Sequence, residues 1–156
     1  MRKEQKRKGS EVNSYVLDTY ALQAFLAAEP GADSVRDLLV KTAAGKAKVY
    51  VSWISLTEVY YVTHRRSAAG ERELLAANTI EGLKRLTIDI VPAGEAEAMK
   101  AGAIKAKYPL SLADAFVAAL GQMHNAEVVT GDPEFRALEE AGEIDVFWLP
   151  QKPKAG

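Results

Sequence analysis

Cysteine is absent from the 156 residues, which excludes a disulfide framework, a thiolate metal site and a cysteine nucleophile. This absence fits a reducing, cytoplasmic location, which we expect. No apolar run approaches the roughly 18 residues of a membrane span, so we expect no membrane association. Histidine is scarce as well. Only His64 and His124 are present, and neither lies in an acid-rich motif, so the sequence gives little support for catalysis by a histidine base.

A net positive charge is lacking outside the start of the chain. Met1–Lys8 carries +4, and the net charge of −1 therefore leaves −5 for the remainder. The mildly acidic net charge of this remainder argues against nucleic-acid binding through net charge alone. A nucleic acid would have to bind through metal ions, local basic residues or the basic start of the chain. No apolar segment follows that start, so it is not a secretory signal. We interpret residues 1–13 as a disordered basic extension, and an RNA-binding arm stays open.

Short apolar segments alternate with helical patterns along the rest of the chain. Strands are expected near residues 15, 48, 87, 126 and 146, and helices near 19–30, 35–42, 55–65, 74–86, 95–107, 115–123 and 134–141. Apolar strands between helices predict an α/β fold, a three-layer αβα sandwich with a mainly parallel sheet of about five strands. This domain should span residues 14–150, with 151–156 as a disordered tail.

The chain is organised around Tyr15–Thr19, a short apolar strand that ends in Asp18 and leads into a helix. Because ligands of open parallel sheets bind outside the carboxyl ends of the strands, Asp18 is a candidate ligand-binding residue. We expect its strand to be central. An aspartate at this position can also simply cap the helix that follows it.

Three further acids have similar positions and similar alternatives. Glu58 follows Ser55 in a capping-box pattern, Asp114 has the same relation to Ser111, and Asp132 precedes Pro133 and can cap a short helix. Four acids near related edges of one sheet nevertheless predict a cation. Oxygen ligands alone suit Mg²⁺ or Mn²⁺ rather than Zn²⁺.

Four motifs in this order resemble those of a PIN-domain ribonuclease, and among these the VapC-type toxins of toxin–antitoxin pairs. The motifs are Y-V-L-D-T-x-A-L, S-L-T-E-V, L-S-L-A-D-A-F-V-A-A and V-V-T-G-D-P-E-F. The resemblance covers about Ser14 to Leu149. By this resemblance the metal-binding, catalytic quartet is Asp18, Glu58, Asp114 and Asp132, and the supporting hydroxyls are those of Thr19 and Thr130.

The same resemblance implies the function. It implies a Mg²⁺-dependent (or Mn²⁺-dependent) endoribonuclease that hydrolyses RNA phosphodiesters with a metal-activated water. It also implies a small antitoxin protein as partner, and a homodimer. The basic extension departs from the short start that is usual in the family.

Other functions stay open at this point. A haloacid-dehalogenase-like phosphatase would have a second aspartate two residues after the first, where Tyr20 stands. A PIN-fold RNA-processing nuclease without an antitoxin and a metal-free PIN-like interaction module are further alternatives. Three aromatic residues, Trp53, Tyr60 and Tyr61, could stack on bases or dock an antitoxin, but we expect them to pack in the core or on a dimer face.

Overall fold

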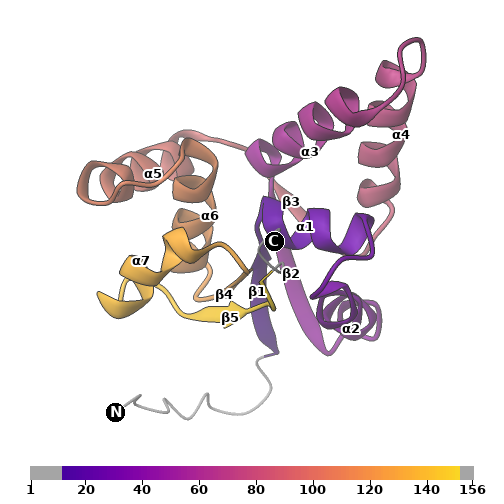
Figure 1. Cartoon of the computed structure of the whole chain (residues 1–156). Helices are drawn as coiled ribbons and strands as arrows, with labels where there is room; N and C mark the ends of the chain where they lie inside the picture. The colour runs from indigo at the N-terminus through magenta and orange to yellow at the C-terminus, as the bar shows by residue number, and fades with distance from the viewer. Residues whose placement is uncertain (1–11, 152–156) are drawn as a thin grey trace.

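The computed structural model of this chain describes residues 12–151, and the predictions for residues 1–11 and 152–156 fall outside them. Five strands form one sheet at its centre, and all of the pairings are parallel (Figure 1). The strands are β1 (Asn13–Leu17), β2 (Ala47–Ser52), β3 (Asp89–Val91), β4 (Glu127–Thr130) and β5 (Val146–Trp148). Their order is β3-β2-β1-β4-β5, so the predicted parallel sheet with a central first strand is confirmed.

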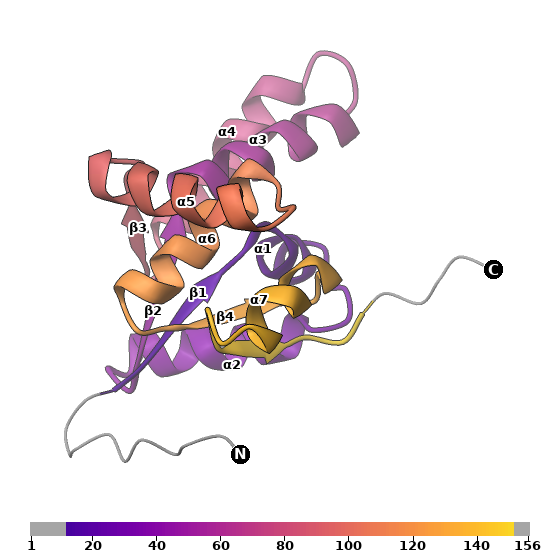
Figure 2. The same cartoon turned by 90° about the vertical axis from the view of Figure 1, so that its left-hand side faces the viewer.

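Helices cover both faces of the sheet, as Figures 1 and 2 show. On one side lie α1 (Thr19–Leu26), α2 (Ala32–Ala43), α3 (Trp53–Arg66) and α4 (Arg72–Lys84). On the other lie α5 (Glu95–Lys107), α6 (Leu112–Met123), the 3₁₀ helix η1 (Pro133–Phe135) and α7 (Arg136–Glu140). The predicted three-layer αβα architecture is therefore confirmed. Among residues 12–151, no helix combines the length and apolar character that crossing a bilayer requires.

Two hydrophobic cores flank the sheet because successive side chains of a strand point to opposite faces. Along β1, Tyr15 and Leu17 belong to the core under α1–α4, whereas Val16 belongs to the core under α5–α7. Burying a side chain such as Leu17 contributes about 1.5–3 kcal/mol to folding. Because β1 is buried on both faces, Asp18, which directly follows Leu17 at the end of this strand, has a fixed position.

The capping box expected at Ser55 and Glu58 is wrong. Helix α3 begins at Trp53, directly after β2, and the hydroxyl of Ser52 accepts a hydrogen bond from the Ile54 N–H at 3.1 Å. Ser52 is the cap because β2 passes into α3 without a connecting loop. Glu58 therefore lies in the second turn of α3, and a role in helix capping does not explain why a glutamate is found at this position.

For the aromatic residues on α3 we expected packing in the core or on a dimer face; core packing is wrong, and the dimer face stays a prediction. Trp53, Tyr60 and Tyr61 are 39%, 38% and 58% exposed. The buried residues of α3 are Ser55, Leu56 and Val59. The helix pairs with α4 in a hairpin that extends away from the sheet in Figure 1, so much of its surface has no layer to pack against.

The first helix is shorter than expected. It ends at Leu26 and not at Pro30, and Gly31, with a φ of 98°, leads into α2. A positive φ of this size suits glycine, so the turn signal of Pro30–Gly31 marks the entry to the second helix.

A candidate metal centre at the carboxyl edge of the sheet

Asp18 is buried at the point where β1 passes into α1. One carboxylate oxygen, Oδ1, accepts a hydrogen bond from the Ala21 N–H at 2.8 Å, as a helix cap does. The other, Oδ2, accepts a short hydrogen bond from the Thr130 hydroxyl. The residue is only 1% exposed. The capping interpretation is therefore correct, but it uses one of the two oxygens and does not explain why a carboxylate is buried here.

Thr130 connects two of the predicted acids. It is the last residue of β4, and its hydroxyl also accepts a hydrogen bond from the Asp132 N–H at 2.9 Å. Asp132 caps η1, since its Oδ1 accepts from the Glu134 N–H at 2.9 Å, and Pro133 occupies the first helical position. Thr19, the other expected supporting residue, instead lines a cavity beside α1 with Val62 and Arg66.

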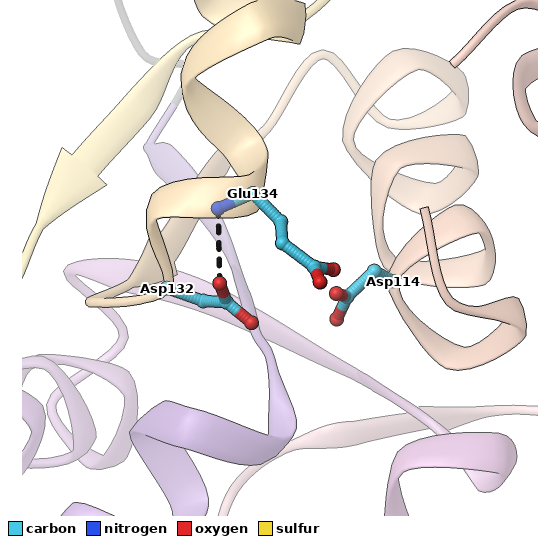
Figure 3. A group of neighbouring side chains, drawn as sticks. All are labelled: Asp114, Asp132 and Glu134. Atoms are coloured by element: carbon cyan, nitrogen blue, oxygen red, sulfur yellow. Dashed lines mark hydrogen bonds between the residues drawn. The ribbon is translucent and has the colours of Figure 1, made fainter. Parts of the chain in front are cut away.

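Asp114 approaches from the opposite side, in the first turn of α6. The hydroxyl of Ser111 caps this helix by accepting from the Asp114 N–H at 3.1 Å, as the sequence predicted. The carboxylate of Asp114 faces those of Asp132 and Glu134 in Figure 3. One oxygen from each of these three residues lies within 4.8 Å of the others. We call Asp114, Asp132 and Glu134 the three-acid cluster.

Glu134 was not predicted as a site residue. The available signal was a second acid two residues after Asp132, which only becomes informative once the turn at Pro133 directs both side chains toward α6. Asp18 and Glu58 are not members of the three-acid cluster in the described part of the chain. Glu58, half-buried on α3, is still close enough for its charge to act on Asp18.

Two acids of this site, Asp18 and Asp114, have raised pKa values. The pKa of Asp18 is raised to about 7, mainly by burial; the hydrogen bonds from Thr130 and Ala21 oppose this rise, and the charges of Asp132 and Glu58 add to it. Burial also raises the pKa of Asp114 to about 8, together with a hydrogen bond shared with Glu134 and the charges of Asp132 and Asp18. Within the part of the chain that the structure describes, no basic side chain is among the groups that shift either pKa.

These observations fit a hard divalent cation. Buried carboxylates are normally paired with a cationic side chain or a metal ion, because an unpaired charge is costly to remove from water. The donors here are oxygens only, as Mg²⁺ and Mn²⁺ prefer. A bound cation would favour the ionised carboxylates of Asp18 and Asp114, whose raised pKa values otherwise favour the protonated forms.

Neither histidine belongs to this site. The Nε2 atom of His64 lies 3.2 Å from Glu73 at the far end of α3, and the ring of His124 stacks on Tyr50 with centroids 4.0 Å apart. Both therefore have contacts away from the acids, and a mechanism without a histidine base stays a prediction.

Comparisons with known proteins agree with this arrangement. The sequence profile of the PIN domain matches residues 15–141, a range that contains all of the acids described above. No curated protein matched the sequence.

Several solved structures share the fold. One is the VapBC2 complex of Rickettsia felis bound to a promoter DNA fragment, with 15% identity, a TM-score of 0.67, and 88% of this chain and 99% of that chain covered. Another is DNA-bound VapBC from Salmonella typhimurium, with 21% identity, a TM-score of 0.65 and coverage of 87% and 98%. A third is Mycobacterium tuberculosis VapC20, a toxin that cleaves the sarcin–ricin loop, with 16% identity, a TM-score of 0.61 and coverage of 87% and 99%.

Proposed function

Because the chain belongs to the PIN-domain family, we propose that it is a metal-dependent endoribonuclease and the toxin of a VapBC-type toxin–antitoxin pair. The observation that carries this proposal is the burial of Asp18 and Asp114 beside Asp132 and Glu134, with no basic partner among residues 12–151. Buried acids without a cationic partner lower the stability of a folded protein, so their presence supports a metal-binding role. The family match also disfavours the phosphatase alternative.

The proposed ligands of Mg²⁺ or Mn²⁺ are the three-acid cluster together with Asp18, and Glu58 completes the set. When bound, the metal supplies an activated water and stabilises the negative charge that develops on the phosphate. The rest of the chain orients the ligands. The Thr130 hydroxyl holds Asp18 and the backbone of Asp132 in one arrangement, and Ser111 fixes the turn that carries Asp114.

The residues also predict the products. A ribonuclease that uses the 2′-hydroxyl as nucleophile generally needs a base such as histidine near the phosphate. His64 and His124 have contacts elsewhere, so we propose hydrolysis by water instead. Water attack leaves a 5′-phosphate on the downstream fragment and a 3′-hydroxyl on the upstream one, with no cyclic intermediate.

The partner proposal is supported by the structural neighbours, which include toxin–antitoxin complexes from Klebsiella pneumoniae, Rickettsia felis and Salmonella typhimurium. We propose a small antitoxin that covers the acidic edge of the sheet, with an arginine directed at Asp18 or Asp114. We further propose a homodimer. An RNA-processing nuclease without an antitoxin would use the same site, and a gene for a small DNA-binding protein next to this one would favour the toxin.

The test is an RNA cleavage assay with purified protein in Mg²⁺ and in EDTA, with analysis of the product ends. We expect cleavage only with metal, and 5′-phosphate ends. Asp18→Asn should lower the rate by at least roughly 100-fold without loss of the fold. Asp37→Asn, at an exposed position on α2, is the matched control and should cleave like the wild type. Cleavage that persists in EDTA, or ends with a 2′,3′-cyclic phosphate, would contradict the mechanism.

A further inference from the structure

The ring of Tyr20 lies directly against Gly131. A Cβ added at Gly131 would come 2.8 Å from the Tyr20 hydroxyl oxygen, and closer still to the ring carbons Cε1 and Cζ. Real Cβ atoms essentially never make contacts this short. Gly131 is not among the described residues with positive φ, so its backbone does not require glycine. Glycine is required here because the space of a side chain is filled by the tyrosine ring.

The segment after β5 closes over the same place. The Tyr20 hydroxyl donates a hydrogen bond to the Pro150 carbonyl oxygen at 3.0 Å. The side-chain amide of Gln151 donates to the Gly131 carbonyl oxygen at 3.3 Å. Tyr20, Gly131, Pro150 and Gln151 therefore form one connected unit, which we call the clasp.

The clasp lies beside the acids and is joined to them through the backbone. Gly131 separates Thr130, which bonds to Asp18, from Asp132, which belongs to the three-acid cluster. Tyr20 is two residues after Asp18 in the first turn of α1. One helical turn therefore contacts the Thr130–Asp132 loop twice, through the Asp18 carboxylate and through the Tyr20 ring. Two contacts fix the direction of a loop, whereas one contact allows it to pivot.

We propose that Tyr20 is a positioning residue for Asp132, and that the clasp holds the Asp132 carboxylate in the three-acid cluster. The metal-binding consequence rests on the proposed function, but the positioning itself does not. Among the described residues, Asp132 makes no hydrogen bond to α1. Its carboxylate accepts from the Glu134 N–H and its own N–H donates to the Thr130 hydroxyl, so both bonds stay within the Thr130–Glu134 segment. Phe135, fully buried in the core with α6, and Thr130, bonded to Asp18, would stay anchored without the ring, but Gly131 and Asp132 between them would lose the contact that fixes their direction.

Two measurements test the proposal. The first is hydrogen exchange of a peptide fragment covering residues 130–135, which reports the Asp132 and Glu134 amides and requires neither metal nor RNA. The second is isothermal titration with Mn²⁺. Tyr20→Ala should speed exchange of this fragment by at least roughly tenfold. It should also weaken Mn²⁺ binding by roughly 10–100-fold, as the loss of an outer-shell partner does. Tyr20→Phe, which keeps the ring, should remain near the wild type.

The contact itself is tested by a pair of glycine variants. Gly131→Ala should reproduce the Tyr20→Ala effects, because the ring and the new methyl group cannot both occupy the space. In a Tyr20→Ala background, Gly131→Ala should have little further effect. Gly102→Ala is the matched control, since an added Cβ there has nothing within 4 Å. If Tyr20→Ala does not fold, Tyr20→Leu replaces it.

The outcomes separate the two proposals. If Gly131→Ala has the same effect in both backgrounds, or if removing the ring leaves the exchange unchanged, the positioning role is wrong. If the wild type binds no Mn²⁺ but the variants change hydrogen exchange as expected, the proposed metal-dependent function is wrong and the positioning role of Tyr20 is supported. Faster exchange with unchanged Mn²⁺ affinity would show that Asp132 is placed by the clasp without serving the metal, and would overturn the metal-binding consequence.

Discussion

Raising the pH should destabilise the metal-free protein between about pH 5 and pH 8.5. Burial raises the pKa of Asp18 from 3.8 to about 7. Because the folded state holds this proton more strongly than the unfolded state, the stabilising contribution is complete only below the unfolded pKa. It is lost as the pH rises through the folded pKa, when the buried carboxylate must ionise beside Asp132 and Glu58.

The magnitude follows from the size of the shift. A rise from 3.8 to about 7 corresponds to roughly 4 kcal/mol, of which roughly 3 kcal/mol is lost above about pH 5. For a chain of this length each kcal/mol changes the melting temperature by roughly 2–4 °C, so we expect a fall of roughly 6–12 °C. Asp114, with its pKa raised to about 8, acts in the same direction. The two carboxyls interact, so their effects should not be added.

Thermal unfolding in EDTA across this pH range measures the effect. Asp18→Asn carries no ionisable group at position 18 and should reduce the pH dependence to the part that Asp114 contributes, whereas Asp37→Asn at its exposed position should leave it unchanged. Adding Mg²⁺ at about pH 8.5 should restore stability, by roughly 2.7 kcal/mol at a concentration 100 times the Kd. A wild-type melting temperature that does not fall relative to Asp18→Asn would refute the reasoning that the buried acid retains a proton.

Three further predictions concern the metal, the assembly and the N-terminus. Asp114→Asn should bind Mn²⁺ at least roughly tenfold more weakly than the wild type in isothermal titration, and equal affinity would remove this residue from the site. Light scattering at micromolar concentrations should give the mass of a dimer, and a monomer throughout would count against the homodimer. Deleting Met1–Gly9 should leave the melting temperature unchanged because Met1 is its only apolar residue; if RNA affinity falls, its salt dependence should flatten as well.

Much of the site could be predicted because strand ends and helix starts have local signals. Asp18 follows an apolar strand and Asp114 follows a capping serine, and both signals lie within a few residues. Glu58 had a misleading local signal, since its pattern with Ser55 resembles a cap that Ser52 provides. Glu134 had almost none, because an acid in the first turn of a short helix is usually only a surface residue.

The sequence by itself determined the alternation of strands and helices, and hence a parallel sheet with Asp18 at the carboxyl end of one strand. These features depend on the period of apolar residues, which is local. Only the tertiary structure decided that Thr130 bonds to Asp18 across 112 residues, and that Tyr20 covers Gly131. Such contacts depend on the register of β1 with β4, in which Leu17 lies opposite Val129. That register is selected by packing on both faces of the sheet at once, and no local pattern encodes it.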